Sequence, residues 1–145
     1  MYWGCFKAGQ VGPLVEVGNK LNGYGYLTLL ENNLDVDAMH QNNTILQQDN
    51  APIHKAACVT NWLQQQGLVL LDWPQQSPDL NPIENVWSHI KAELDKLSIT
   101  SKAMLRIEIQ QIWRNIEAAY LENLIDSMPR RVAAVIRSRG GFTNY

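Results

Sequence analysis

Two acidic residues, Asp49 and Glu84, stand in segments whose residue types suit chemistry at phosphorus. The segment "QQDNAPIH" (47–54) places Asp49 directly before an Asn, a Pro and a His, and "NPIENVW" (81–87) places Glu84 just after a proline. Hard divalent cations such as magnesium take carboxylate oxygens as ligands, and paired ions can hold the attacking and leaving oxygens of a displacement at phosphorus. Asp49 and Glu84 are therefore candidate metal ligands.

Each of these residues also has an ordinary structural interpretation. Glu84 stands three positions after Asn81, where the Glu of a capping box belongs, and Asp49 could cap a helix that follows it. His54, one turn beyond Asp49, is of the kind commonly found on a helix surface. Spacing alone leaves these alternatives open.

The elements that must position the two acids begin with a predicted hairpin. The runs 2–6 and 13–17 are rich in strand-forming residues and are separated by a glycine-containing segment, which predicts two antiparallel strands. After Asn22, a candidate cap, leucines recur at helical spacing and predict a first helix.

Asp49 is expected at the end of a strand. The run 44–49 predicts a short strand, and Pro52 suits the first turn of a second helix that extends to about Gln66 and stops at Gly67. The apolar run "LVLLDW" (68–73) predicts a further strand, buried on both faces.

Glu84 is expected in the first turn of a third helix that begins at Asn81, after the proline-rich loop "PQQSPDLNP", in which Asp79 is a candidate turn former. A fourth helix is predicted at roughly 102–125, and Pro129 separates it from a short final helix. This order predicts a layered α/β domain, with a core of about 1–98 and a helical part of about 99–145. In an open α/β sheet, ligands collect outside the carboxyl ends of the strands, where the two acids can meet.

Composition and charge limit the class of protein. With 145 residues, 46% of them hydrophobic, the length favours a single domain, and a net charge of −2 excludes a wholly polybasic chain or a disordered acidic tail. The C-terminal stretch from Ser127 is different, because it carries arginines and no acid. These arginines are candidate phosphate contacts, or else ordinary solvated charges near helix ends: Arg130, Arg131, Arg137 and Arg139.

The cysteines and the hydropathy suggest the compartment. Cys5 and Cys58 form no C-x-x-C pair, so neither a zinc site nor a disulfide framework is indicated. The sequence contains no signal-peptide pattern and no run near the roughly 18 apolar residues that a membrane span needs. We therefore expect a soluble intracellular protein with no membrane partner.

The motifs themselves resemble a known family. "QQDNAPIH" followed by "WPQQSPDLNPIENVW" resembles the catalytic core of Tc/mariner superfamily transposases, and 34 residues separate Asp49 from Glu84, as that family's second and third acids require. "WGCF", "GPLVEV" and the closing "MPRRVAAVIRSRGG" resemble the family's pattern in the same order. The resemblance therefore extends over nearly the whole chain.

This resemblance implies that residues 1–145 are part of a DDE catalytic domain with a ribonuclease-H-like fold, an incomplete mixed sheet flanked by helices with a helical C-terminal extension. It implies metal-dependent DNA cleavage and strand transfer in the nucleus, with two magnesium ions, or manganese, held by three acids. Asp49 would be the second acid and Glu84 the third. The implied partners are transposon-end DNA, target DNA and other transposase subunits.

The family's first acid has no counterpart in this sequence. In the family it lies on the strand before the hairpin, whereas the acids upstream of Asp49 lie in the second hairpin strand or in and after the first helix: Glu16, Glu31, Asp35 and Asp37. We therefore expect a fragment with little or no activity by itself. The absent strand would leave two unpaired sheet edges, one on the hairpin and one on the strand ending at Asp49.

Two other functions remain as alternatives. The chain could be a noncatalytic remnant that binds DNA or transposase subunits through its helical C-terminus. It could also be an unrelated metallohydrolase using Asp49, His54, Glu84 and His89, although the sequence has no H-E-x-x-H or Cys/His zinc spacing. Bound zinc instead of magnesium would favour the metallohydrolase.

Overall fold

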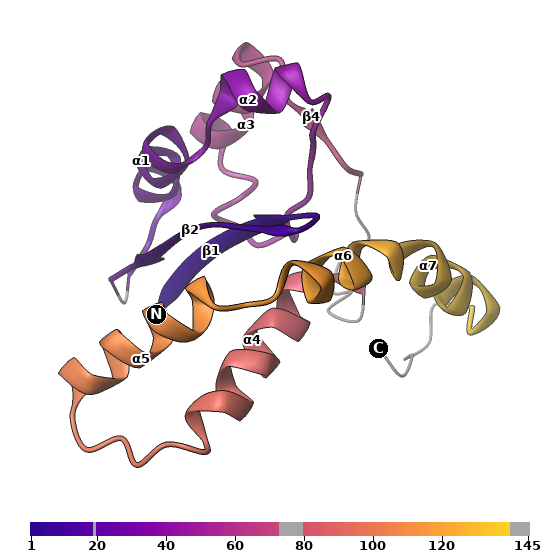
Figure 1. Cartoon of the computed structure of the whole chain (residues 1–145). Coiled ribbons are helices and arrows are strands. Elements are labelled where there is room, and N and C mark those ends of the chain that lie inside the picture. The colour runs from indigo at the N-terminus through magenta and orange to yellow at the C-terminus, as the bar shows by residue number, and fades with distance from the viewer. Residues whose placement is uncertain (19, 73–79, 140–145) are drawn as a thin grey trace. The chain divides into compact units, whose positions relative to one another are not determined.

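The computed structural model describes residues 1–18, 20–72 and 80–139 (Figure 1). Contacts within the chain divide it into two compact units. One consists of Met1 and Val17–Ser77, and the other of Tyr2–Glu16 with Pro78–Tyr145. The N-terminal hairpin belongs to the same unit as the C-terminal helices, and the expectation of a single domain stays a prediction. The division into parts near residue 98 stays a prediction about domains.

The predicted hairpin is confirmed. Strand β1 (Tyr2–Lys7) pairs antiparallel with β2 (Gln10–Glu16), with Tyr2 opposite Glu16 and Lys7 opposite Gln10. The turn is tighter than expected because only Ala8 and Gly9 connect the strands, and Gly9 has the positive φ of +72° that such a turn favours.

The hairpin packs against α4 (Pro82–Leu94), α5 (Lys102–Arg114) and α6 (Ala118–Asp126). Trp113 on α5 is only 2% exposed, stacks on Trp87 with ring centroids 5.5 Å apart, and donates its Nε1–H to the Gly12 carbonyl at 2.9 Å. This tryptophan therefore joins strand and helices in one core. The buried members of that core are Val86, Ile90, Ile109, Trp113, Ile116, Leu121 and Leu124.

The predicted helix at roughly 102–125 is in fact two helices. Asn115 ends α5 and its backbone N–H donates to the Gln111 carbonyl, while Glu117, in an extended conformation, precedes α6. Ile116, at the break between the two helices, is a buried member of the core. The predicted final helix is confirmed as α7 (Met128–Arg137), but Pro129 lies inside its first turn and not before it.

The other unit contains α1 (Gly23–Asn33), α2 (Val36–Gln41) and α3 (Ala57–Gln65). The predicted Asn22 cap is confirmed, since its side chain accepts the Gly25 N–H at 2.8 Å. Helix α2, which the sequence analysis did not separate from α1, has its own cap at Asp35. Helices α1 and α3 pack together around apolar residues: Tyr26, Leu29, Leu30, Val59 and Leu63.

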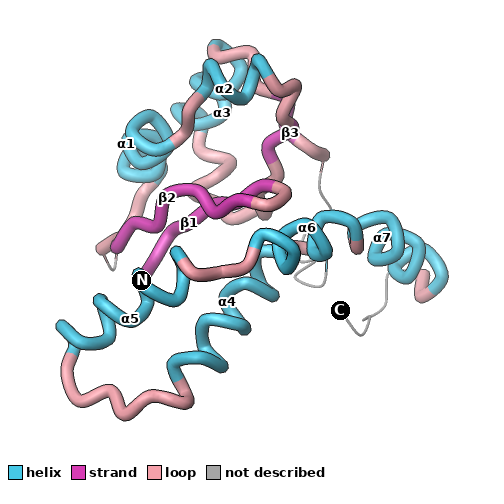
Figure 2. The backbone as a smooth tube through the Cα atoms, in the orientation of Figure 1, coloured by secondary structure: helices cyan, strands magenta, loops and turns pink. Residues whose placement is uncertain are grey.

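The strands of this unit are much shorter than predicted. Strand β3 (Ile45–Leu46) pairs in parallel with β4 (Val69–Leu70), so the strand expected at 44–49 ends before Asp49 (Figure 2). The expectation that 68–73 is buried on both faces is wrong. Val69 is 59% exposed and Leu70 40%, because β4 pairs only with β3 among the described residues.

The second helix also begins later than predicted. Residues 52–55 form a turn, in which the backbone N–H of His54 donates to the Ala51 carbonyl, and α3 begins only at Ala57. Its end agrees with the prediction, since Gly67 has a φ of +64° just beyond the last turn. The proline-rich loop, including Asp79, lies almost wholly outside the described residues.

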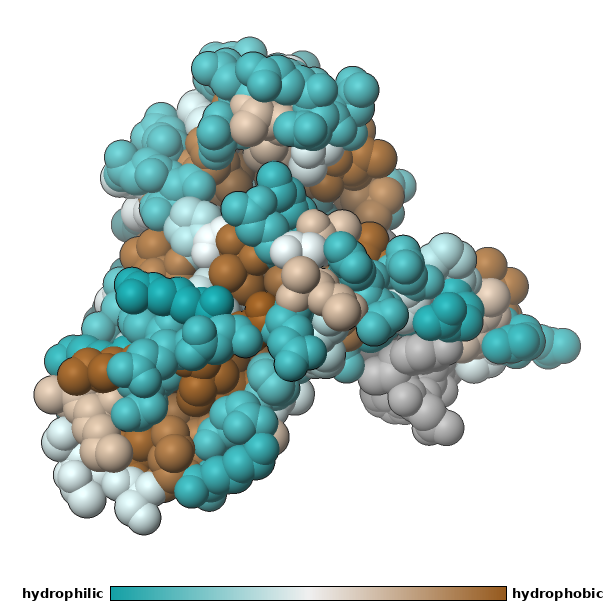
Figure 3. Space-filling view, viewed as in Figure 1, coloured by the Kyte–Doolittle hydropathy of each residue, from teal (hydrophilic) through white to brown (hydrophobic). Residues whose placement is uncertain are grey.

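Large apolar side chains are also exposed on the described chain, and Figure 3 shows such residues, coloured brown, reaching the surface. They include Ile45, Val69, Ile107 and Ile136. Within the described ranges, no helix combines the length and the apolar character that crossing a membrane would require.

Candidate functional site

Asp49 lies in the segment between β3 and α3 and shapes that segment through one oxygen. Its Oδ1 accepts the backbone N–H of Ala51 at 3.0 Å and lies 2.7 Å from His54 Nδ1. The first contact closes a local turn of the kind that Asp side chains favour, which explains an acid two residues before an alanine and a proline. Asp49 remains 56% exposed at its side chain.

His54 is the partner of Asp49. Because an ionised carboxylate only accepts hydrogen bonds, the hydrogen of this contact lies on Nδ1. The His54 side chain is 16% exposed, and its ring packs against that of Tyr26 in α1, with centroids 4.3 Å apart and the ring planes tilted by 32°. Tyr26 in turn donates its hydroxyl to Gln48 Oε1 at 2.9 Å. The expectation of a helix-surface histidine is wrong, because residues 52–55 are not helical and the ring contacts both Tyr26 and the Asp49 carboxylate.

Glu84 occupies the third position of α4, as predicted, and is exposed. The capping box that would explain it structurally is not formed, since the Asn81 side chain makes no capping bond and the Glu84 N–H donates instead to the Asn81 backbone carbonyl at 3.1 Å. Within the part of the chain that the structure describes, the Glu84 carboxylate makes no hydrogen bond or ion pair. It is available to an external cation.

The two candidate acids belong to different units, so their convergence on one ion stays a prediction. Among the described residues, no group of three or more His, Cys, Asp and Glu side chains is arranged to hold a metal. His89, which the metallohydrolase alternative requires, instead lies against the Tyr120 ring with centroids 5.2 Å apart.

Glu16, the acid nearest the start of the chain, is an ion-pair partner. It accepts hydrogen bonds from Arg106 Nε at 2.8 Å and from Nη2 at 3.0 Å. These bonds lower the pKa of the Glu16 carboxyl. A carboxylate that accepts two hydrogen bonds from one arginine stabilises the fold, and both Glu16 oxygens are already occupied.

The C-terminal arginines do not form one set. Arg130, Arg137 and Arg139 are exposed, as phosphate contacts must be. Arg131 is 3% exposed and donates its Nε–H to the Ser127 hydroxyl at 2.7 Å, and that hydroxyl donates to the Leu124 carbonyl at 2.6 Å. The prediction that Arg131 binds nucleic acid is corrected accordingly, because its side chain is buried in the junction between α6 and α7.

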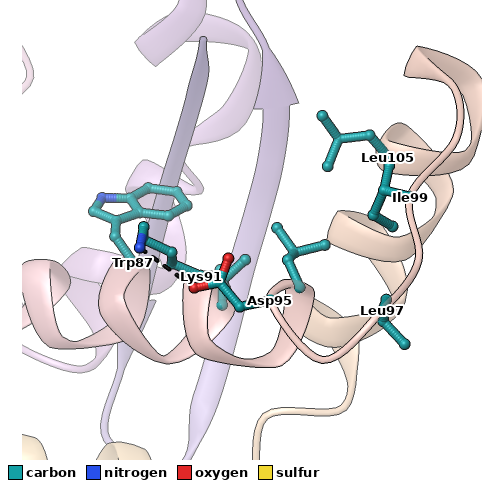
Figure 4. A pocket seen from close by; sticks show the side chains of 8 residues that line it. Trp87, Lys91, Asp95, Leu97, Ile99 and Leu105 are labelled. Atoms are coloured by element: carbon teal, nitrogen blue, oxygen red, sulfur yellow. Dashed lines mark hydrogen bonds and ion pairs between the residues drawn. The ribbon is translucent and has the colours of Figure 1, made fainter.

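The structure also contains an open apolar groove that the sequence analysis did not predict (Figure 4). It has a volume of about 590 Å³ and lies along the end of α4 and the start of α5, where Lys91 pairs with Asp95 at 3.3 Å. Neither candidate acid lines it. Its apolar wall includes Trp87, Leu94, Leu97, Ile99 and Leu105.

Comparison with known proteins identifies the family. The sequence profile of the DDE superfamily endonuclease family matches residues 16–106, more than half of the chain. The Tcb1 transposase of Caenorhabditis briggsae and the Tc1 transposase of Caenorhabditis elegans are each 35% identical to this chain over 147 residues. The alignment covers all of this chain and 54% of each relative, so the chain spans about half their length.

Solved structures show the same fold. The catalytic domain of the Mos1 mariner transposase matches with a TM-score of 0.82 at 19% identity, over 99% of this chain and 82% of that one. The Mos1 catalytic domain with raltegravir and Mg matches with a TM-score of 0.78 at 21% identity, and the match covers 91% of this chain and 70% of that one. A pre-cleavage Mos1 transpososome matches with a TM-score of 0.83 at 20% identity, and the match covers 96% of this chain and 44% of that one. These matches confirm the predicted ribonuclease-H-like α/β fold.

Proposed function

This chain belongs to the DDE superfamily endonucleases, and from that membership we propose that it forms part of a DNA transposase catalytic domain. It would contribute Asp49 and Glu84 as the second and third acids of a site for DNA cleavage and strand transfer. The observation that carries this proposal is that the matched region contains both acids and that both carboxylates are exposed.

The residues present fit a divalent ion. The Glu84 carboxylate makes no hydrogen bond among the described residues, and the Asp49 carboxylate uses only Oδ1 for its contacts with described residues. A divalent ion bound there supplies Lewis acidity at a phosphoryl oxygen and lowers the pKa of bound water. We propose magnesium, with manganese as an alternative, a choice supported by the Mos1 structure that contains Mg.

The partners follow from the same proposal. A Mos1 transposase paired-end complex with the left transposon end, among the matching structures, supports transposon-end DNA as a substrate. We propose target DNA and other transposase subunits as the remaining partners. The site of action would be the nucleus. By itself the 145-residue chain should cleave little or no DNA, because no acid upstream of Asp49 stands where the family's first acid stands, and Glu16 is already paired with Arg106.

A chimera tests this function directly. The part of Tc1 transposase that precedes its match to this chain is fused upstream of Met1, and nicking of labelled Tc1-end DNA is measured in magnesium and in manganese. We expect nicking by the chimera and none by the chain alone. Asp49→Asn or Glu84→Gln should abolish nicking, whereas Glu31→Gln, an exposed glutamate on α1, should leave it unchanged. A folded chimera that still nicks with Glu84→Gln would disprove the assigned role.

A noncatalytic DNA-binding function is the second candidate. The exposed arginines at 130, 137 and 139 favour it, because the stretch from Ser127 onward contains no acid to neutralise them. Such a function would need neither carboxylate, so a folded chimera that binds Tc1-end DNA without nicking it would favour this second candidate.

A further inference from the structure

We infer that His54 is a positioning residue for Asp49: held on Tyr26, it occupies one carboxylate oxygen and leaves the other for the cation. This inference rests on the proposed function. It goes further in assigning how Asp49 binds the ion, through Oδ2 alone, and in naming the side chains that enforce this.

Within the Asp49 carboxylate, both polar contacts fall on one oxygen. Oδ1 accepts the Ala51 N–H at 3.0 Å and lies 2.7 Å from His54 Nδ1, which also donates to the Asp49 backbone carbonyl oxygen at 3.2 Å. No described residue contacts Oδ2 in this way. The terminal torsion of an Asp side chain is otherwise broad and nearly two-fold, so two donors on one oxygen fix the plane of the carboxylate. A cation approaching Asp49 meets an oriented Oδ2.

His54 is itself held in place. Its side chain is much less exposed than that of Asp49, because the ring lies on Tyr26, which is buried in the α1–α3 core. The Tyr26 hydroxyl bonds Gln48, the residue directly before Asp49. The contacts therefore run from Gln48 to Tyr26, to His54 and back to Asp49, and they tie the acid to α1. These contacts restrict the orientation of the His54 ring, whereas the ring of an exposed surface histidine would be free to rotate.

A donor behind a metal-binding carboxylate affects affinity without touching the ion. Outer-shell partners of this kind typically change metal affinity by about 10–100-fold when they are removed. The neutral imidazole with its hydrogen on Nδ1 suffices for this role.

Manganese binding to the 145-residue chain tests the inference without any cleavage assay. The chain is labelled with ¹⁵N, and paramagnetic broadening of the backbone amides of residues 48–54 is followed as Mn²⁺ is added. His54→Phe keeps a ring on Tyr26 but removes the donor, and His54→Asn restores a donor near the Nδ1 position. We expect His54→Phe to weaken binding about 10–100-fold, and His54→Asn to recover most of that loss.

The amide spectra report whether each variant is folded, and imidazole ¹⁵N spectra of the unmodified chain report the tautomer directly. The hydrogen should reside on Nδ1 when the ring is neutral. Wild-type affinity in His54→Phe, equal loss in both His54 variants, or a hydrogen on Nε2 would each overturn the inference. Asp49→Asn should abolish the broadening. Broadening that persists in Asp49→Asn would instead refute the proposed metal site itself, so the two failures are distinguishable.

Discussion

Glu16 and Arg106 form the ion pair with the most specific geometry among the described residues, two hydrogen bonds between one carboxylate and one guanidinium. The pairing lowers the pKa of Glu16 below its ordinary value of 4.5. A carboxyl whose pKa is depressed in the folded state contributes stability above its unfolded pKa and loses it as the pH falls through the folded value. The contribution of this pair should therefore disappear below about pH 4.5.

Glu16→Gln should lower the melting temperature at neutral pH but not at strongly acidic pH, where the Glu16 carboxyl is protonated and the ion pair is lost. The decrease should be small because solvent screens this exposed pair. Thermal melts of the two proteins across this range check the prediction, with Glu31→Gln as the control for loss of an exposed carboxylate on another element, α1. A deficit of equal size at every pH would show that Glu16 acts through packing and not through charge.

At the candidate site, the sequence indicated Asp49 and Glu84 as candidate acids but not the residues that contact Asp49. The role of the two acids stays a prediction, which rests on motifs and spacing that are local. Tyr26 could not be predicted, because its contact with His54 depends on how α1 packs beside the following segment, which no local pattern records. The burial of Arg131 was missed for a similar reason, since α7 turns it toward Ser127 on the preceding helix end.

Among the elements, the three helix ends marked by Asn22, Gly67 and Pro82 were predicted correctly, because these residues act through the backbone next to them. Strand lengths were predicted worst. A run of apolar residues predicts a strand buried on both faces only if other elements cover both faces of the sheet, and Val69 and Leu70 of β4 are exposed. β3 and β4 pair over two residues each. The break between α5 and α6 was missed because the apolar period continues through it.

The contact between the hairpin and α5 requires a glycine at position 4, because Trp113 packs where a side chain would lie. A Cβ at Gly4 would lie 2.8 Å from Trp113 Cη2 and 3.1 Å from Leu14 Cδ1, and Trp113 is fully packed. Gly4→Ala should therefore destabilise the chain by about 1–3 kcal/mol, the usual cost of overpacking a core.

Chemical denaturation measures this change, and Gly18→Ala is its matched control because a Cβ at Gly18 meets nothing within 4 Å. The control should change stability little. Equal stability of Gly4→Ala and the unmodified chain would mean that Trp113 can move aside at no cost.

Helix α7 presents the exposed arginines, and its effect on DNA belongs to the helix as a whole. The double change Arg130→Ala with Arg137→Ala should weaken binding similarly across unrelated DNA sequences, because phosphate contacts carry no base information. The slope of log affinity against log salt should become shallower by about 1 for each arginine that no longer binds a phosphate.

Fluorescence titrations at several salt concentrations test this, with Arg114→Ala on α5 as a control for an exposed arginine elsewhere. Arg131→Ala is expected to lower stability instead, since it removes a buried hydrogen bond. Weaker binding to one DNA sequence only would contradict a phosphate-binding role.

For the whole molecule, the described strands form two separate two-stranded sheets, β1 with β2 and β3 with β4. Two-stranded sheets are marginal by themselves, and exposed strand edges invite pairing with other chains. Ile45 and Val69 add exposed apolar surface at β3 and β4. The resemblance to Tc/mariner transposases implies a further strand, the one with the first acid, and we predict that it pairs with the hairpin and with β3.

A chain extended upstream with the corresponding Tc1 segment should therefore melt at a higher temperature and remain monomeric at concentrations where the 145-residue chain self-associates. The added strand would pair an edge of each sheet and cover part of the apolar surface, which lowers the free energy of the folded monomer relative to both the unfolded chain and the aggregate. Thermal melting and analytical sedimentation compare the two proteins, and a segment of equal length with prolines at alternate strand positions controls for added mass. A 145-residue chain that is monomeric and as stable as the extended one would show that the strand does not lie between these two sheets.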